Sequence, residues 1–423
     1  MTRREHRVLV VAPTTFFADY GCHVRILEEA RAIAERGGRV VIATYPGGQT
    51  PDGLQVERPN ASPWGNAVRV GSSYHRIYLD LLLLLKAIVT AMWFRPTIVH
   101  AHLHEGALIG WCISRLWRVP VVFDFQGSLT SEMIDHGYLR PTDLTFRPLR
   151  WVEREICRRS DAILTSSDNA VDVLVRTFGV ARERITAVPD AADATRFRPR
   201  WLVAETQREA GRAALKLPAG RRIVAYLGLL AEYQGTSRLL RAAAAVRAVR
   251  EDVHFLVMGF PGVETYSRQA RDLGIADAVT FTGRVPYARA PELLTLADVA
   301  VAPKLSATEG NGKLLNYMAV GLPTVAYDRP VNREILGEEG VFADPSDEAS
   351  LANAILQLLA DPDAPNRGRR LRERVEREFS WSEVGATILS VYARVSHPLA
   401  TERCGSARAP SRPRRNDQSL VDL

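Results

Sequence analysis

Short apolar segments alternate with stretches of helical periodicity along most of the chain. The apolar run Val8–Ala12 is followed by a helical pattern over Val24–Arg36, which Gly37 and Gly38 end, and then by a second apolar run, Val40–Thr44. Strands joined through a helix in this way lie parallel in one sheet. Nearly continuous Val, Ile, Leu and Ala is typical of strands covered on both faces. The pattern therefore predicts an α/β fold with a doubly wound parallel sheet.

The same pattern continues through the first half of the chain and starts again after a polar break at Ala214–Arg221. In the first half it predicts further strands at Ile98–Ala101, Pro120–Phe123, Ala162–Thr165 and Ile185–Val188. In the second half it predicts strands at Ile223–Leu227, Phe255–Met258, Val279–Phe281, Val299–Ala302, Thr324–Ala326 and Val341–Ala343, with helices such as Thr236–Arg250 and Pro291–Leu296 between them.

This restart indicates two domains. We expect two Rossmann-like domains of similar size, 1–200 and 215–380, joined by a linker near 199–220. One more amphipathic helix is expected over 381–396. The tail 397–423 contains prolines and few large apolar residues, so we expect it to be disordered.

Composition places the chain among ordinary soluble proteins with a mildly basic balance. Its 423 residues are 46% apolar and 24% charged, which is enough to form two cores. The net charge of +7 suits a protein that meets phosphate groups or an anionic membrane surface, although an arginine-rich genome would give the same balance. We find no basic stripe interleaved with aromatic residues and expect no nucleic acid partner.

The cysteines and the apolar segments bear on where the protein acts. Four scattered cysteines without C-x-x-C spacing indicate a reducing compartment, and the charged N-terminal residues lack the apolar core of a signal peptide. The most apolar stretch, Leu79–Phe94, is interrupted by Asp80 and Lys86 and falls short of a membrane-spanning run. We interpret it as a core helix or a helix on a membrane surface. We expect a cytoplasmic protein, with peripheral contact to the inner face of the plasma membrane left open.

The loop after the predicted strand Val299–Ala302 holds the densest candidate chemistry. It contains Lys304 and Glu309, and Gly310–Gly312 precedes a helix that begins at about Lys313. Glycines allow close backbone approach, a helix N-terminus favours negative charge, and two lysines add positive charge in a chain where lysine is scarce. This arrangement suits a nucleotide diphosphate. A solvated loop before a core helix explains most isolated G-x-G strings, but this loop lies beyond the carboxyl end of a strand, where ligands of open α/β sheets bind.

Polar residues also follow strands of the first half. In the loop Pro13–His23, Gly21 permits a tight turn at the entrance of a helix, where an anion could bind; an ordinary strand–helix loop is the alternative. The segment Asp124–Ser128 could contact substrate hydroxyl groups, or Asp124 and Ser128 could cap the next helix.

Three histidines, His100, His102 and His104, alternate at the end of one predicted strand. They would lie on one face, and so could bind a metal, only if the chain stays extended. The sequence offers no evident cysteine or carboxylate partner, so we expect no metal site. It also contains no Gly-x-Ser-x-Gly, Walker or His-Glu-x-x-His motif, which leaves a hydrolase triad or a P-loop without support.

Three segments give the chain a family resemblance that covers about residues 6–396. Ala187–Pro199 is similar to V-P-N-G-V-D-x-x-x-F-x-P; Phe281–Pro286 and Ala297–Pro303 are similar to F-x-G-x-v-p and a-D-v-f-v-x-P; and Glu309–Val325 is similar to E-G-f-G followed by E-A-M-A-x-G-x-P-V-V. Together they resemble the retaining glycosyltransferases of family 4, which have the GT-B fold. The resemblance implies two Rossmann-like domains that face a cleft, the first for the acceptor and the second for a nucleotide sugar. It also implies a C-terminal helix that crosses back to the first domain.

The resemblance implies roles for individual residues. Glu309 matches the first glutamate of the family's E-x7-E pair, which helps orient the donor sugar, and Gln126 stands where the family often has a histidine; these two are the catalytic candidates. Gly310 and Gly312 match the diphosphate-binding loop, and Gly21 matches a glycine-rich loop near the donor phosphate and the acceptor. The donor-binding candidates are Gly21, Lys304, Gly310, Asn311, Gly312, Lys313, Leu314 and Asn316. The acceptor-side candidates are His23, His104 and Asp124.

The chain also departs from the family pattern at three positions. Asn316 replaces the second glutamate of the pair, one residue early, and Leu229 and Gln234 replace the arginine and lysine that usually neutralise the diphosphate. Charge-assisted contacts to phosphate are strong, so losing two without replacement should cripple donor binding. Our hypothesis is that Lys304 and Lys313 supply the missing charge; decay of the site is the alternative.

The resemblance implies an enzyme that transfers a sugar from a nucleotide diphosphate donor to an acceptor hydroxyl with retention, in surface polysaccharide or glycolipid assembly. It implies no metal and no cofactor besides the nucleotide sugar as co-substrate, and a carbohydrate or lipid-linked acceptor as partner. Two alternatives remain open: a non-catalytic nucleotide-sugar sensor or partner subunit, and a nucleotide-sugar epimerase of the same shape.

Overall fold

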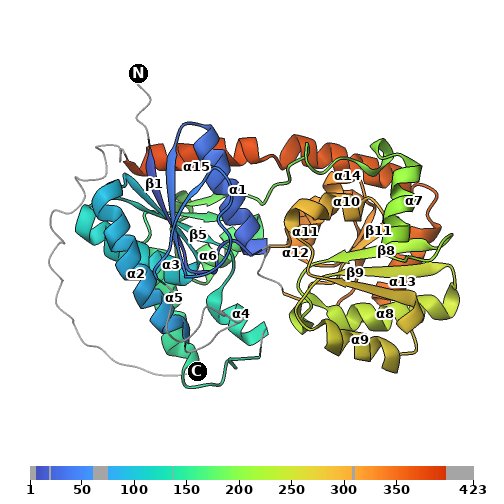
Figure 1. The fold of residues 1–423 in the computed structure, drawn as a ribbon. Coiled ribbons are helices and arrows are strands. Elements are labelled where there is room, and N and C mark those ends of the chain that lie inside the picture. Colours follow the sequence, from blue (N-terminus) through green and yellow to red (C-terminus); the bar gives the residue numbers. More distant parts are fainter. Residues whose placement is uncertain (1–5, 19–20, 61–74, 136, 307–309, 397–423) are drawn as a thin grey trace, which may run out of the picture.

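The structure is a computed structural model that describes residues 6–18, 21–60, 75–135, 137–306 and 310–396. Two α/β domains lie side by side, the first on the left and the second on the right of Figure 1. Glu309 and the tail 397–423 lie outside the described residues, so the expectations for them stay predictions.

The first domain is built on seven parallel strands in the order β3-β2-β1-β4-β5-β6-β7. They are β1 (Arg7–Ala12), β2 (Arg39–Thr44), β3 (Gln55–Glu57), β4 (Ile98–His102), β5 (Val121–Phe125), β6 (Ala162–Thr165) and β7 (Ile185–Ala187). All the strands expected in this half are present, with small shifts at their ends. The sequence pattern misses the edge strand β3, because Gln55 and Glu57 flank a single apolar residue.

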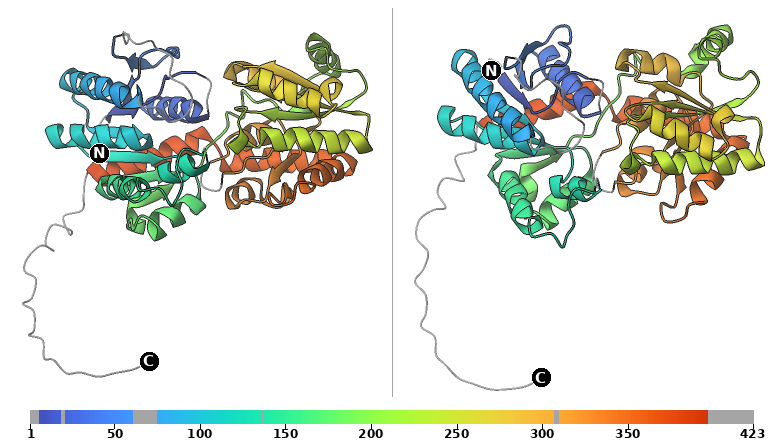
Figure 2. Two further views of the ribbon diagram at one scale, coloured as in Figure 1. Left: turned by 90° about the horizontal axis from the view of Figure 1, so that it is seen from below. Right: turned by 60° about the horizontal axis from the view of Figure 1, so that its bottom comes forward.

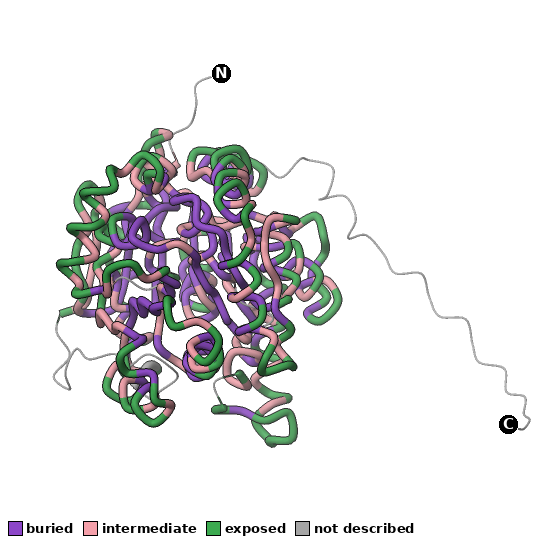
Figure 3. The backbone as a smooth tube through the Cα atoms, turned by 90° about the vertical axis from the view of Figure 1, so that its right-hand side faces the viewer, coloured by how far each residue is buried: buried purple, intermediate pink, exposed green. Residues whose placement is uncertain are grey.

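Helices cover both faces of the first sheet. They are α1 (Gly21–Glu35), α2 (His75–Phe94), α3 (Leu103–Trp117), α4 (Leu129–Asp135), α5 (Phe146–Arg159) and α6 (Asp168–Arg176). Alternate residues of β1 point to opposite faces: Val8 and Val10 join the core that contains α1, and Leu9 and Val11 join the core that contains α2, α3 and α5. The buried strands at the centre and the exposed outer sides of the helices can be followed in Figure 3.

The second domain has six parallel strands in the order β10-β9-β8-β11-β12-β13. They are β8 (Arg222–Leu227), β9 (Val253–Met258), β10 (Val279–Gly283), β11 (Val299–Ala302), β12 (Thr324–Tyr327) and β13 (Val341–Ala343). The helices of this domain are α7 (Glu205–Ala214), α8 (Thr236–Val249), α9 (Val263–Asp272), α10 (Ala290–Leu294), α11 (Lys313–Ala319), α12 (Pro330–Leu336), α13 (Ser350–Ala360) and α14 (Ala364–Glu378), and the chain ends with α15 (Trp381–Ser396). The core on one side of the sheet contains residues of α8, α9 and α13. The core on the other side contains residues of α10, α11, α12 and α14.

Short 3₁₀ turns join several of these elements. They lie at Arg182–Arg184, Arg200–Leu202, Glu232–Gln234, Ala276–Ala278, Tyr287–Arg289 and Gly337–Glu339. The region 199–220, expected as a linker, contains α7, which packs against the second domain. Arg208 and Arg212 of α7 donate hydrogen bonds to the carbonyl oxygens of Thr295 and Leu296. The sequence pattern did not predict this helix as part of the second domain, because arginine side chains and not an apolar face make these contacts.

Helix α15 crosses back to the first domain, as expected (Figures 1 and 2). It packs along α1, where a side chain at Gly385 would place its Cβ atom 2.9 Å from the carbonyl oxygen of Ala32. Near its end, the Tyr392 hydroxyl lies 2.7 Å from Nδ1 of His100 on β4. The last helix is therefore part of the first domain's core and ties the two domains together.

Helix α2 is unusually apolar. Among the described residues it alone contains a segment, Ile77–Phe94, long and apolar enough to cross a membrane by length and composition. Of that segment, 33% is buried, and the buried residues, such as Leu83 and Ala87, pack on the first sheet. This corrects our expectation that the stretch falls short of a membrane-spanning run, although the core helix of a soluble protein passes the same test.

Candidate active site

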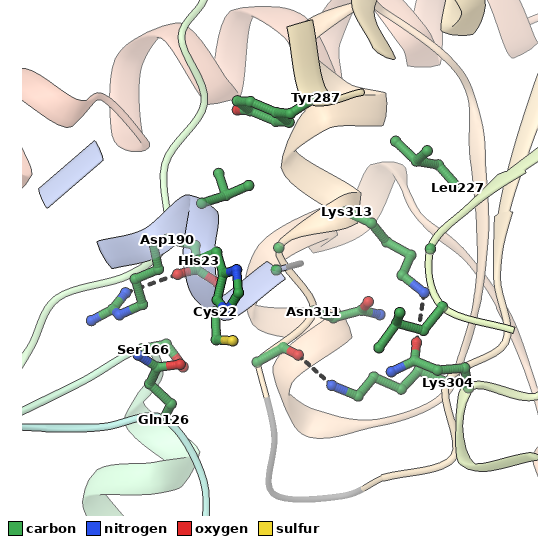
Figure 4. Close-up of a pocket in the computed structure, with 18 of the residues that line it drawn as sticks. Cys22, His23, Gln126, Ser166, Asp190, Leu227, Tyr287, Lys304, Asn311 and Lys313 are labelled. Atoms are coloured by element: carbon green, nitrogen blue, oxygen red, sulfur yellow. Dashed lines mark hydrogen bonds and ion pairs between the residues drawn. The ribbon is translucent and has the colours of Figure 1, made fainter. Parts of the chain in front are cut away.

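A cavity of about 430 Å³ lies between the two domains, at the carboxyl ends of strands from both sheets. Its first-domain wall comes from the chain after β1, β5, β6 and β7, and its second-domain wall from the chain after β8, β9 and β11 (Figure 4). The volume is that of an ordinary small-molecule site. Its lining includes the predicted residues Gly21, His23, Gln126, Lys304, Gly310, Asn311, Gly312, Lys313 and Asn316.

Two glycines let the second domain approach the first across this cavity. A Cβ atom at Gly310 would lie 3.0 Å from Oγ of Ser166, and one at Gly312 would lie 3.0 Å from Oδ2 of Asp190. Nearby, the carboxylate of Glu334 accepts a hydrogen bond from the backbone N–H of Asp168. The glycine loop therefore allows both walls to close around one ligand.

Lys313, the first residue of α11, brings its ammonium group to the loop after β8. Its Nζ atom lies 2.7 Å from Oε1 of Gln234 and 4.6 Å from the centre of the Tyr226 ring. A Cβ atom at Gly228 would lie 2.7 Å from the same Nζ, so the missing side chain there makes room for the lysine. The family resemblance places a lysine at Gln234, and the structure brings Lys313 from another element beside this residue.

Lys304 follows β11 and is buried, with 6% of its surface exposed. Its Nζ atom donates a hydrogen bond of 2.7 Å to the carbonyl oxygen of Gly310. Lys304 therefore links the two ends of the loop that also contains Asn311 and Gly312. Figure 4 shows Lys304, Asn311 and Lys313 together on the second-domain wall.

The residues around α11 differ in their access to the cavity. The amide nitrogen of Asn311 donates to Oδ1 of Asn332, which holds the Asn311 side chain in place. The Oδ1 atom of Asn311 is buried and has no hydrogen-bond partner among the described residues, so it can accept a hydrogen bond from a ligand. Asn316 lines the cavity, whereas Leu314 is fully buried in the core and lies outside the lining, contrary to our expectation.

On the first-domain wall, His23 and Gln126 are both fixed by hydrogen bonds. Nδ1 of His23 accepts a hydrogen bond of 2.9 Å from the backbone N–H of Ala18, so the neutral ring carries its proton on Nε2. The amide nitrogen of Gln126 donates to Oδ2 of Asp124 at 2.8 Å. Its Oε1 atom then remains as the hydrogen-bond acceptor of this side chain.

Asp124 is fully buried behind Gln126 and does not line the cavity. The guanidinium group of Arg25 binds it through two nitrogens, at 2.7 and 3.0 Å, and Nδ1 of His102 lies 2.9 Å away. Burial alone would raise the pKa of Asp124, but Arg25 and His102 hold it well below its usual range. The expected acceptor-side role of Asp124 is thus replaced by support for Gln126.

Arg25 and Asp190 are lining residues that sequence reasoning missed. Nη1 of Arg25 lies 2.8 Å from Oδ1 of Asp190, and Nη2 lies 3.0 Å from Oε1 of Glu29. Burial raises the pKa of Glu29 well above its usual value, despite the attraction of Arg25. The four-residue spacing of Arg25 and Glu29 was the only sequence signal, because Asp124 lies on β5 and Asp190 follows β7, both far from Arg25 in the sequence.

The three alternating histidines do not share one face. The chain turns at Leu103, whose φ is 59°, and enters α3, so His104 leaves the row of His100 and His102. His104 packs against Phe123 and Phe125, and burial lowers its pKa. It lies outside the cavity lining, contrary to the expected acceptor-side role.

His100 and His102 lie with Glu29 in one buried group whose ligand atoms fall within 4.8 Å of one another. No local sequence pattern indicates this carboxylate, because Glu29 comes from α1. A metal ion there would lie beside the Arg25 guanidinium, which already offsets the charge of the group, and electrostatic repulsion disfavours it. We assign the group to the core network and not to a metal site.

Two family models match consecutive parts of the chain and together cover most of it. Residues 20–191 match the glycosyl transferase 4-like domain, and residues 207–377 match glycosyl transferases group 1. The first match covers the wall that holds His23 and Gln126. The second covers the wall that holds Lys304 and Lys313.

Curated relatives extend over nearly the whole chain. The D-inositol 3-phosphate glycosyltransferase of Xylanimonas cellulosilytica is 27% identical over 401 residues, which is 89% of this chain and 92% of that protein. The protein of the same name from Corynebacterium diphtheriae is 26% identical over 397 residues, covering 88% and 89% of the two chains.

Solved structures share the fold at low sequence identity. Sucrose-phosphate synthase from Thermosynechococcus elongatus superposes with a TM-score of 0.78 at 19% identity, over 92% of this chain and 99% of that one. Anabaena HepE in complex with UDP and glucose gives a TM-score of 0.74 at 16% identity, over 92% and 100%. With the two parallel sheets, the crossing helix and the family matches, the chain belongs to the group 1, family 4-like glycosyltransferases and is a glycosyltransferase with the GT-B fold.

Proposed function

We propose that this enzyme transfers a sugar from a nucleoside diphosphate donor to a hydroxyl group of a neutral acceptor, with retention at the anomeric carbon, in surface polysaccharide or glycolipid assembly. The observation that carries the proposal is the position of Lys313. Its ammonium group lies in the second-domain wall against Gln234, the position at which the family resemblance leads us to expect a lysine. A cation fixed beside the diphosphate stabilises the negative charge that grows as the sugar leaves.

The second-domain wall supports binding of the donor. Lys313 and Lys304 supply positive charge, Gly310 and Gly312 allow the backbone to approach closely, and Asn311 offers a buried acceptor. UDP-glucose is the first donor to test, because HepE, which shares the fold, was solved with UDP-glucose. GDP and ADP sugars are the competing donors.

The first-domain wall supports a neutral acceptor. The described lining residues on this side include the carboxylates of Glu132 and Asp190, and the single arginine, Arg25, is already bonded to Asp124, Glu29 and Asp190. A phosphorylated acceptor, such as the D-inositol 3-phosphate named for the relatives, would meet these carboxylates. Sugar hydroxyls, by contrast, can pair with Asp190 and with Oε1 of Gln126.

Thermal shift followed by a transfer assay tests the proposal. The purified chain is heated with UDP, GDP, ADP and their sugars, and the donor that gives a selective shift is incubated with neutral glycosides, glycolipids and D-inositol 3-phosphate. We expect a product with the donor's anomeric configuration, read by NMR, and no product from the inositol phosphate. Conversion of the donor without acceptor would indicate an epimerase, and binding without turnover would indicate a sensor; either result would overturn the proposal.

A further inference from the structure

Helix α2 presents an apolar face to the outside of the first domain. Its exposed side chains recur at helical spacing, with exposed fractions of 72% at Ile77, 54% at Leu81, 54% at Leu85 and 55% at Met92. The opposite side of the helix is buried on the sheet. A helix on the surface of a soluble domain normally turns polar residues outward, so this face lacks the partner that its composition requires.

The charged residues of α2 do not make its outward face polar. Within Ile77–Phe94 the charged side chains are Asp80 and Lys86. Asp80 accepts a hydrogen bond from the Tyr45 hydroxyl, and Nζ of Lys86 lies 2.7 Å from the Glu57 carboxylate. Both charges are thus bonded to the domain's own residues, and the outward row stays apolar.

The apolar face continues onto the neighbouring helices α3 and α5. Leu108 and Leu116 of α3 are exposed by 50% and 64%, and Trp151 of α5 is exposed by 60%. A groove of about 190 Å³ lies between these two helices; most of its lining is apolar, and Glu155 and Arg159, which form an ion pair, also line it. In Figures 1 and 2, α2, α3 and α5 lie on the flank of the first domain away from the second domain. We call the outward sides of these three helices the α2–α3–α5 face.

Exposed arginines border this face. The guanidinium groups of Arg115 and Arg159 each lie 5.3 Å from the centre of the Trp111 ring in the groove wall. Further exposed arginines from these helices and their ends are Arg95, Arg118, Arg147, Arg154 and Arg158. An apolar strip with a cationic border complements the surface of an anionic bilayer, where acyl chains lie below a layer of negative headgroups.

We propose that the α2–α3–α5 face docks the protein on a membrane surface rich in anionic phospholipid. The apolar row of α2 and the side chains of Leu108 and Trp151 enter the boundary between headgroups and acyl chains, and the arginines contact the phosphates. Helix α2 lies along the surface and does not cross it, because its other side is part of the sheet's core. The proposal does not depend on which donor or acceptor the enzyme uses.

Flotation of the full chain with vesicles tests the docking. We use vesicles of phosphatidylcholine alone and of phosphatidylcholine mixed with phosphatidylglycerol. The protein should float with the mixed vesicles and be partly released by high salt, since surface charge attraction is screened. A Leu81→Gln, Leu85→Gln, Met92→Gln variant should bind at least about tenfold less, because it loses the buried apolar area.

Controls separate docking from folding and from self-association. Val249→Gln and Leu202→Gln replace equally exposed apolar residues, on α8 and in the 3₁₀ turn before α7, and should bind vesicles as the wild type does. All variants should keep the wild-type melting temperature. Wild type that fails to float with the mixed vesicles would overturn the proposal, as would unchanged binding of the triple variant. A wild-type dimer that the triple variant converts to a monomer would assign the face to a second copy of the chain instead.

Discussion

The Nζ atom of Lys313 lies 2.7 Å from Oε1 of Gln234, although the two residues are 79 positions apart in the sequence. Gln234 stands where the family resemblance places a lysine, and Lys313 begins the helix after the glycine loop. We propose that this lysine, from a different element, supplies the positive charge that the donor needs at the same place. Gly228, which has no side chain to block the ammonium group, permits the arrangement.

Replacing this lysine should weaken donor binding without unfolding the protein. Lys313→Ala removes a charge-assisted contact to phosphate worth about 1.5–3 kcal/mol, so the Kd for the nucleotide sugar should rise about 10- to 150-fold. Calorimetric titration measures it. The matched control is Lys86→Ala, which removes a lysine on α2 paired with Glu57, far from the cavity. Equal Kd values for the two variants would show that Lys313 does not contact the donor.

Closure of the cavity should be sensitive to a single methyl group at Gly310. Gly310→Ala would place Cβ 3.0 Å from Oγ of Ser166, closer than a relaxed contact, so the two walls could not approach fully. We expect kcat to fall by about tenfold or more, because a small misplacement of bound groups slows transfer. The melting temperature should stay unchanged. Adding Ser166→Ala removes the clash and should restore part of kcat; a double variant no faster than Gly310→Ala would argue against this explanation.

The buried Arg25–Asp124 pair should matter for stability, and Gln126 for catalysis. Asp124→Asn leaves the guanidinium short of a partner and should destabilise the fold by about 3 kcal/mol, measured by urea unfolding. Gln126→Ala cuts only one hydrogen bond to this pair and should leave stability nearly unchanged while kcat falls. If Asp124→Asn unfolds at the wild-type urea concentration, the network does not support the site as we describe.

A buried histidine in the second sheet predicts a specific loss of stability in acid. Burial lowers the pKa of His254 to about 4 in the folded protein, against about 6.5 in the unfolded chain. Its stabilising contribution is therefore complete above pH 6.5 and is lost as the pH falls toward 4. His254→Gln should show less loss of stability over that range than the wild type, by urea unfolding at several pH values. Parallel pH profiles would contradict the prediction.

The parts of the molecule that the sequence predicted are those set by local pattern. The strand Val299–Ala302, the glycine loop, the start of α11 at Lys313 and the helix α15 follow from neighbouring residues, whereas the return of α15 to the first domain was implied by the family resemblance alone. The network of Arg25, Asp124 and Asp190 could not be predicted, since its members are 99 and 165 positions from Arg25 and meet only in the folded sheet.

His104 shows the same limit at short range. The alternation of His100, His102 and His104 is strand-like, but the chain turns at Leu103 and becomes helical. The turn at Leu103 therefore separates His104 from His100 and His102 and places it against Phe123 and Phe125. Neither the turn nor the carboxylate of Glu29 beside His100 leaves a signal in the local sequence.

Exchanging the two residues of the opening contact tests the central claim most directly. Donor Kd is measured for the wild type, Lys313→Gln, Gln234→Lys and the variant with both changes. If the donor site needs one cation at this place, Lys313→Gln should bind weakly, and the double variant, with lysine restored at 234, should regain most of the lost affinity. A double variant that binds no better than Lys313→Gln, or a Lys313→Gln variant that binds like the wild type, would contradict the account.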